Sequence, residues 1–283
     1  MTDAPLIGPV AAPELQVMSF NIRRRMPKVS AYSPDHWSNR RGLVQRILAA
    51  EQPTILGAQE ALADQVGVLA AGLGPHYGWV GEGRNADRRG ERNLLFYDTE
   101  RLTLTGWRQR ALSDTPDRPG SRSWGNRIPR IVVSAEFTDI PTGRRVIAFT
   151  THFDHQVPAA RWRSAEMIVD LVAEAHAAEP DAAIVVTGDV NADVDSAVYR
   201  RLTASGVLRD SWEAADTRLT PQWGTFSDYA PLRRGGKRID LILVGPGVDV
   251  VSAGINVTRF DGAAASDHEP VQAVLRYPPK AVE

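Results

Sequence analysis

The chain has 283 residues, 43% of them hydrophobic, and its 33 basic and 34 acidic side chains give a net charge of −1. This composition suits a folded chain with a substantial core, and it excludes the strong overall positive charge that favours sequence-independent DNA binding. The absence of cysteine excludes disulfides and thiolate metal sites. The N-terminal segment has neither a basic stretch nor a long apolar run, so we expect no signal peptide or transmembrane helix, and a cytoplasmic location.

The spacing of apolar residues predicts alternating strands and helices along the chain. A flexible lead-in is expected over residues 1–13, followed by a single domain over residues 14–283. Strands are expected at residues 15–22, 54–60, 77–80, 93–97, 102–107, 130–137, 144–153, 182–189, 235–245, 250–260 and 270–277. Helices are expected at residues 34–52, 61–74, 159–177 and 195–205. These elements favour two packed sheets with helices outside.

Polar side chains recur where the predicted strands end. They are Asn21, Gln59, Glu60, His152, Asp154, Asp189, Asn191, Asp240, Asp267 and His268. Any one of them is explained by a turn or a helix cap, but rigid scaffolds also present functional groups at strand ends. The oxygen-rich set suits a hard cation such as Mg²⁺ or Mn²⁺, and the two histidines lack the spacing of a helical zinc motif.

Six short segments carry these residues in a recognisable order: "MSFNIR", "GAQEA", "TTHFDH", "VVTGDVNAD", "RIDLILV" and "SDHEPV". Over residues 15–276 they resemble the endonuclease/exonuclease/phosphatase superfamily, and the "GDxN" segment followed far downstream by "SDH" is specific. The resemblance implies an α/β four-layer sandwich, in which two packed mixed sheets are flanked by helices. It also implies hydrolysis of phosphate esters by in-line attack of water, assisted by one or two Mg²⁺ or Mn²⁺ ions.

The resemblance assigns the metal group to Glu60, Asn21, Asp267 and Asp189. Glu60 follows a glutamine in the family's pattern, as it does in "GAQEA". The alternative interpretations are a cap of the following helix for Glu60 and a turn residue for Asn21.

The catalytic residues implied by the resemblance begin with His268, whose ring Asp240 would hold. Histidine is the natural general acid or base near neutral pH. Asp189 would orient the attacking water or bind a metal, and Asn191 would donate to a phosphate oxygen. Because residues two apart in an extended segment face the same way, we expect Asp189 and Asn191 on one side of "GDVN".

A second histidine, His152, matches the deoxyribonuclease-like branch and would contact the phosphate. Its expected carboxylate partner is Glu91 in "GERNLLFY". Arg130 resembles an arginine that faces the phosphate, with a surface charge as the alternative. Asp154 and His155 are expected to support these residues from behind.

The resemblance specifies the reaction better than the substrate. Basic and aromatic residues over 108–130 and 223–238 would suit a nucleic acid or a smaller polyanion. The near-neutral net charge favours a small-molecule phosphodiester or phosphomonoester. An endonuclease or exonuclease acting on DNA or RNA is the alternative, and a catalytically silent binding module is a third. The sequence does not specify the oligomeric state.

Overall fold

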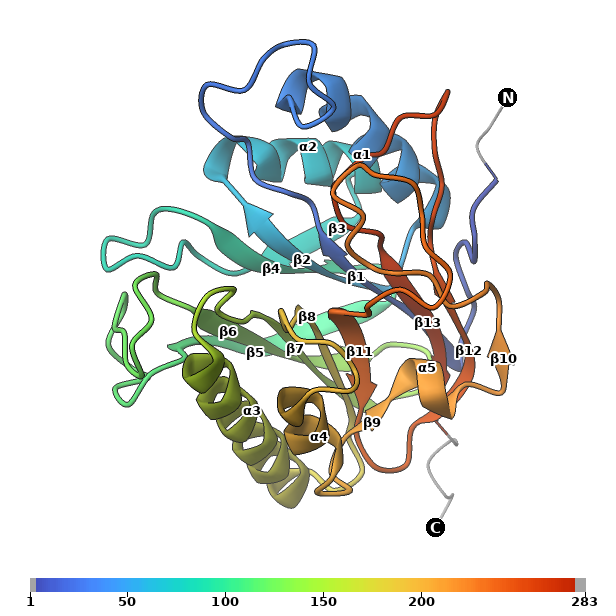
Figure 1. Cartoon of the computed structure of the whole chain (residues 1–283). Coiled ribbons are helices and arrows are strands. Elements are labelled where there is room, and N and C mark those ends of the chain that lie inside the picture. Colours follow the sequence, from blue (N-terminus) through green and yellow to red (C-terminus); the bar gives the residue numbers. More distant parts are fainter. Residues whose placement is uncertain (1–3, 278–283) are drawn as a thin grey trace.

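The computed structural model describes residues 4–277, which form two face-to-face sheets with helices on both outer sides (Figure 1). This arrangement confirms the predicted four-layer sandwich. The seven-stranded sheet has the order β10 (Thr217–Arg218), β12 (Asp249–Ile255), β13 (Val271–Arg276), β1 (Glu14–Asn21), β2 (Ile55–Ala61), β4 (Arg92–Asp98) and β3 (Tyr77–Val80). The six-stranded sheet has the order β5 (Leu102–Ala111), β6 (Ile131–Asp139), β7 (Arg145–His152), β8 (Ala183–Asp189), β11 (Asp240–Val244) and β9 (Arg209–Asp210).

Helices cover the outer face of each sheet. They are α1 (Trp37–Glu51), α2 (Ala63–Leu73), α3 (Pro158–Ala178) and α4 (Ala197–Thr203). The short helix α5 (Ser211–Ala214) instead lies against β9, β11 and β12, and its Trp212 is part of the core between the sheets. In Figure 1, α1 and α2 lie above the seven-stranded sheet, and α3 and α4 lie below the six-stranded sheet. The second helix begins later than predicted because β2 continues through Ala61. Among residues 4–277, no helix combines the length and hydropathy that crossing a membrane requires.

Three of the structure's short elements were not predicted, and two strands are shorter than expected. The unpredicted elements are β9, α5 and β10, which have two, four and two residues. Such short elements carry too few residues to show a period. β11 begins only at Asp240 because the glycines at 235 and 236 form a loop, and β12 ends at Ile255.

The strand β1 shows how alternation divides its side chains between two cores. Leu15 and Val17 face the other sheet, whereas Met18 and Phe20 pack beneath the outer helices. This follows from the two-residue period of a strand, whose successive side chains point to opposite faces. All four side chains are at most 1% exposed, and each contributes about 1.5–3 kcal/mol through its burial.

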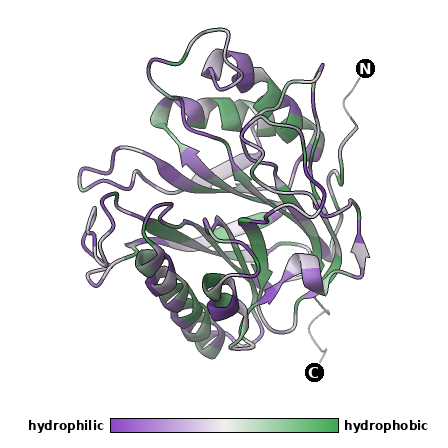
Figure 2. Ribbon diagram, viewed as in Figure 1, coloured by the Kyte–Doolittle hydropathy of each residue, from purple (hydrophilic) through white to green (hydrophobic). Residues whose placement is uncertain are grey.

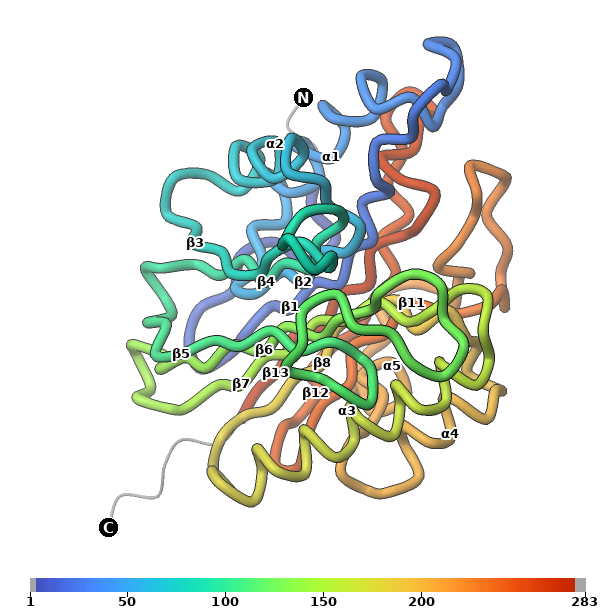
Figure 3. Tube along the Cα trace, turned by 90° about the vertical axis from the view of Figure 1, so that its left-hand side faces the viewer, coloured from blue at the N-terminus to red at the C-terminus, as the bar shows by residue number. Residues whose placement is uncertain are grey.

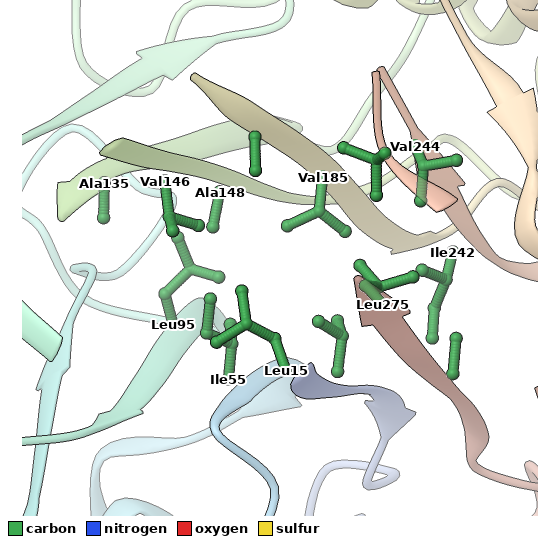
Figure 4. Close-up of a cluster of buried hydrophobic side chains, with 14 of the residues drawn as sticks. Leu15, Ile55, Leu95, Ala135, Val146, Ala148, Val185, Ile242, Val244 and Leu275 are labelled. Carbon is green, nitrogen blue, oxygen red and sulfur yellow. The ribbon is translucent and has the colours of Figure 1, made fainter. Parts of the chain in front are cut away.

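The core between the sheets is built from the inward side chains of both. Ile55 and Leu95 of the seven-stranded sheet meet Val146, Ala148 and Val185 of the six-stranded sheet (Figure 4). In Figure 2 the strands β11, β12 and β13 are coloured mainly as hydrophobic, whereas the loops at the left-hand end are mainly hydrophilic. The two sheets therefore form one continuous core, which fixes the positions of their strand ends relative to one another.

The inward faces of the strands turn polar toward the left-hand end of the sandwich. In β1 the inward residues after Val17 are Ser19 and Asn21, and in β8 Val185 is followed by Thr187 and Asp189. The sheets approach closely here. A Cβ atom on Gly57 of β2 would lie 1.9 Å from the hydroxyl oxygen of Thr187, so only glycine fits at this position.

The N-terminal segment docks against a buried carboxylate. Glu51, at the end of α1, is 2% exposed and accepts hydrogen bonds from the backbone N–H groups of Leu6, Ile7 and Gly8. Its oxygens also accept from the side-chain amides of Asn256 at 2.8 Å and Gln272 at 2.7 Å. Residues 6–8 thus differ from the flexible lead-in expected over 1–13, of which residues 1–3 lie outside the described chain.

Glu51→Ala should lower the free energy of unfolding by about 3 kcal/mol, because buried N–H donors would lose their shared acceptor. Urea unfolding followed by circular dichroism measures the change. Glu174→Ala, at an exposed position of α3, is the matched control and should stay within about 0.5 kcal/mol of the wild type. Equal losses in the two variants would contradict the stabilising role of the Glu51 hydrogen bonds.

Candidate active site

A pocket opens between the two sheets at their polar ends and encloses about 390 Å³. Figure 3 looks onto this end of the molecule. Eight of the predicted site residues line the pocket: Glu60, Glu91, Arg130, His152, Asp189, Asn191, Asp267 and His268. The other two, Asn21 and Asp240, are buried behind it and hydrogen-bond to lining residues. The fold therefore brings all ten together, although the chain separates the first from the last by 247 positions.

Asn21 links the two sheets at the base of the pocket. Its side-chain amide donates to Glu60 Oε1 at 3.0 Å and to Asp189 Oδ2 at 3.1 Å. Its own oxygen accepts from the backbone N–H of Arg23 at 3.0 Å, which orients the amide. Asn21 thus links carboxylates from both sheets.

Glu60 reaches the pocket through a break in the strand. Regular alternation would place it on the face of Leu56 and Ala58, which packs against the outer helices. A register shift between Ala58 and Ala61 and a φ of 67° at Glu60 turn its side chain inward instead. Burial opposes ionisation of this carboxyl, but hydrogen bonds from Asn21 and from the backbone of Arg24 lower its pKa overall.

His268 and Asp240 form a buried pair. The ring Nδ1 lies 2.8 Å from Asp240 Oδ2, and the side chains of the two residues are 7% and 1% exposed. Burial alone would lower the pKa of His268, but the charge and hydrogen bond of Asp240 raise it well above the usual value. The imidazolium form is therefore favoured, and its other nitrogen points toward Asp189, with an Nε2–Oδ2 distance of 3.8 Å.

Asp189 lies between the two histidines. Its Oδ2 is 3.4 Å from His152 Nε2, and its Oδ1 accepts from the backbone N–H of Asn191 at 2.9 Å. Burial raises the pKa of Asp189 and the nearby charge of Asp240 raises it further, while His268 opposes them. Asp189 is thus a carboxylate whose environment favours taking up a proton.

Asn191 does not continue the extended segment expected for "GDVN". β8 ends at Asp189, and Asn191 has a φ of 49°, which turns the chain into the left-handed region. Its amide donates to the carbonyl of Phe153 at 3.1 Å. Asn191 still lines the pocket, but the same-side reasoning that related it to Asp189 was wrong, because the turn chemistry of Asn replaced the strand.

Glu91 is not the partner of His152. Its two carboxylate oxygens pair with Arg84 at 2.6 and 2.7 Å, and Arg24 lies 3.3 Å away. His152 instead faces Asp189, and burial together with the charge of Arg130 lowers its pKa well below the usual value. The prediction missed the arginines, whose only sequence signal is the density of basic residues in "NIRRR" and "GEGRNADRRGER".

Arg130 is a buried part of the pocket wall, not a surface charge. It is 3% exposed, and its Nη2 lies 2.9 Å from His155 Nδ1. Asp154 is 3.9 Å from its Nε and accepts the backbone N–H groups of Gln156 and Val157 just before α3. Arg130 is therefore fixed by residues at the end of β7.

The carboxylates of Glu60 and Asp267 on the pocket wall form a candidate cation site. Burial raises the pKa of Asp267, and the negative charge of Glu60 raises it further, against the effects of His268 and Arg23. Arg23 Nε lies 3.4 Å from Asp267 Oδ2 and offsets part of this charge. Carboxylate oxygens that repel one another suit a hard divalent ion, so the donor chemistry fits Mg²⁺ or Mn²⁺.

A second group of donor atoms comes from Asp189, Asp240 and His268, which lie within 4.8 Å of one another. Asp240 Oδ2 and His268 Nδ1 are paired through their 2.8 Å contact, whereas Asp240 Oδ1 is buried and has no hydrogen-bond partner among residues 4–277. Of the two carboxylates in this group, Asp189 is the one that lines the pocket.

The acid-lined pocket between two sheets of a four-layer sandwich is the arrangement of a phosphoesterase fold. Residues 18–268 match the Endonuclease/Exonuclease/phosphatase family, and the chain belongs to this family. The match confirms the resemblance and supports hydrolysis of phosphate esters as the class of activity.

Known proteins that are similar to this chain include two from Bacteroides and one from a virus. The mannosyl-6-phosphatase of Bacteroides thetaiotaomicron is 30% identical, with a TM-score of 0.86 over 93% of this chain and 100% of its own. An endonuclease/exonuclease/phosphatase of Bacteroides vulgatus is 32% identical, with a TM-score of 0.85 over 94% and 99% of the two chains. A protein of Acanthamoeba polyphaga mimivirus is 27% identical over 63% of this chain and 68% of its own.

Glu91→Gln should lower the free energy of unfolding by about 3 kcal/mol, because it leaves the largely buried guanidinium of Arg84 without its counter-ion. Glu82→Gln is the matched control, since Glu82 pairs with Arg88 at 3.0 Å while both side chains are more than 40% exposed. That change should cost at most about 1 kcal/mol. Similar losses for the two variants in urea unfolding would mean that the buried pair is no stronger than the exposed one.

Proposed function

We propose that this protein is a divalent-metal-dependent hydrolase of small-molecule phosphate esters, with a phosphomonoester favoured over a phosphodiester. The observation that carries the proposal is the convergence of Glu60, Asp267, Asp189 and His268 on one pocket. Its volume of about 390 Å³ falls in the range of small-molecule sites. The full-length similarity to a protein described as a mannosyl-6-phosphatase supports the choice of a phosphomonoester.

In this proposal Glu60 and Asp267 would hold the divalent ion. Asn21 keeps Glu60 in place through its 3.0 Å hydrogen bond. When bound, the metal neutralises charge on the phosphate oxygens and stabilises the leaving oxygen. Mg²⁺ and Mn²⁺ are the favoured ions because the donors are oxygens.

The protein's own groups supply the proton chemistry. Asp189, whose raised pKa favours proton uptake, accepts a proton from the attacking water. His268, kept as an imidazolium by Asp240, donates a hydrogen bond from Nε2 to a phosphate oxygen and stabilises the negative charge of that oxygen. Asn191 and His152 line the same pocket and contact the phosphate.

A nuclease activity is less well supported by the surface around the pocket. The predicted basic loops contribute Ile128, Arg130 and Phe226 to the pocket lining. Arg233 and Arg234 of the second loop are exposed and do not line it, and Arg234 lies over the ring of Trp223. A continuous basic track for a nucleic-acid backbone therefore has no support from these two arginines.

Turnover should require a divalent ion. Excess chelator should abolish hydrolysis of a phosphomonoester, and added Mg²⁺ or Mn²⁺ should restore it. Parallel assays with bis(p-nitrophenyl) phosphate, nucleotides and plasmid DNA separate monoesterase from diesterase and nuclease activity. Full activity in chelator would overturn the metal requirement, and metal binding without turnover of any ester would indicate a binding module.

Glu60→Gln should weaken Mn²⁺ binding by about tenfold or more, because a ligand loses its charge. Calorimetric titration of the purified protein measures this without any substrate. Glu82→Gln is again the control, since Glu82 does not line the pocket. An unchanged Mn²⁺ titration in Glu60→Gln would remove this residue from the metal group.

His268 and Asp240 should act as a unit in catalysis. His268→Ala should lower kcat by about 10²-fold or more, and Asp240→Asn should cost much of the same amount because the ring loses its orientation and charge. The double variant should be little slower than His268→Ala, since both changes break one interaction. Thermal melts confirm folding. Additive losses would show that the two residues work independently.

A further inference from the structure

One histidine at the rim of the pocket has no part in the proposed chemistry. His155 lines the pocket and is exposed, whereas His152, three residues earlier, is 6% exposed at its base. The Nδ1 atom of His155 lies 2.9 Å from Nη2 of the buried Arg130. An exposed ring is thus attached to a fixed internal group.

The contact with Arg130 determines which nitrogen of His155 carries the proton. A guanidinium has only N–H donors and stays protonated in proteins, so Nδ1 must be the acceptor. The proton of the neutral ring therefore resides on Nε2. Burial and the adjacent charge of Arg130 both lower the pKa of His155, which agrees with a neutral ring.

Arg130 is well placed to hold the ring in one orientation. Its charge lies 3.9 Å from the carboxylate of Asp154, which is itself held by two backbone N–H groups at 2.8 Å before α3. Its Nε and Nη1 atoms are buried and have no hydrogen-bond partner among residues 4–277. The contact of Nη2 with His155 is therefore the one hydrogen bond of this guanidinium within residues 4–277, and it fixes the direction of the opposite Nε2–H.

The place of His155 relative to the base of the pocket indicates what it contacts. His152, Asp189 and His268 are all nearly buried, so a phosphate bound among them presents its ester group toward the rim. The rim also carries apolar side chains, Ile128 and Phe226, which suit the carbon skeleton of an alcohol. With the phosphate at the base, an N–H donor at the rim faces the alcohol part of the substrate, whose hydrogen-bond acceptors are hydroxyl oxygens.

We propose that His155 is a specificity-determining residue whose Nε2–H donates to a hydroxyl oxygen of the alcohol part of the substrate, and that Arg130 is its positioning residue. The substrate class is then a phosphorylated polyol or sugar. This inference rests on the proposed phosphoesterase function, because it takes the phosphate to lie at the base of the pocket.

The first test measures the protonation of the ring directly. In ¹⁵N-histidine NMR spectra near neutral pH, the signals absent from His155→Gln identify this residue, and they should show the neutral Nε2–H form. Arg130→Met should produce a mixture of the two neutral forms or a charged ring, and Arg130→Lys, which keeps a cationic donor, should restore Nε2–H. A protonated Nδ1 in the wild type, or no change in Arg130→Met when Arg130→Lys also folds, would overturn the positioning role.

The second test separates the alcohol from the phosphate. With Mg²⁺ present, His155→Ala should raise KM for mannose 6-phosphate by about fivefold to tenfold, the value of one neutral hydrogen bond, with kcat within twofold. KM for p-nitrophenyl phosphate, whose leaving group has no hydroxyl besides the ester oxygen, should stay unchanged. His155→Gln retains an N–H donor and should recover part of the loss. His76→Gln, outside the pocket, is the control and should match the wild type on both esters.

The outcomes also distinguish this inference from the proposed function. Equal increases in KM on both esters would assign His155 to the phosphate, and no increase on either would remove it from the site. Both results overturn the inference. If no ester is hydrolysed at all, the proposed function fails, and calorimetry still decides the inference: His155→Ala should weaken binding of mannose 6-phosphate but not of inorganic phosphate.

Discussion

The close packing of the two sheets is the constraint on which the rest of this structure depends. At Gly57 the gap is so small that a Cβ atom would lie 1.9 Å from the hydroxyl of Thr187 in the opposite sheet. The same packing continues into the polar strand ends, where Asn21 of one sheet hydrogen-bonds to Asp189 of the other at 3.1 Å. A shift of either sheet would separate these groups, so the packing of the core also determines the geometry of the site.

The site buries several ionisable groups, and neighbouring residues compensate the charges of only some of them. Asp240 is compensated by His268, and Glu60 by the N–H groups of Asn21 and Arg24. Asp189 and Asp267 keep raised pKa values because burial and neighbouring carboxylates disfavour their charge. Such partial compensation is typical of functional sites, and it leaves room for a cation or a proton to complete the balance.

Two arginines of the pocket wall, Arg84 and Arg130, both contact other side chains of the protein. Arg84 pairs with both carboxylate oxygens of Glu91. Burial lowers the pKa of Arg84 to about 10, so this arginine is still charged at neutral pH. Arg130 is buried between Asp154 and His155. The positive charges of these two arginines therefore lie beside internal partners.

The sequence by itself determined most of the strands, the main helices and the segments whose polar residues meet at the pocket. Alternation and β-branched runs mark strands locally, and the segments around Asn21, Glu60, Asp189 and His268 carry a specific order of residue types. These signals are short-range properties of the chain. They can therefore be recognised without any knowledge of how the sheets pack.

Tertiary structure alone decided how those residues pair. Both faces of β1 are buried, so its alternation could not tell which face carried Asn21 toward the other sheet. Glu91 matched a family glutamate, but its partner depended on where Arg84 and Arg24 were folded. Asn191 was expected in an extended segment, and its φ of 49° reflects a turn whose amide bonds to Phe153, 38 residues away. Side-chain partners are chosen by distance in space and by burial, and neither quantity is local in the sequence.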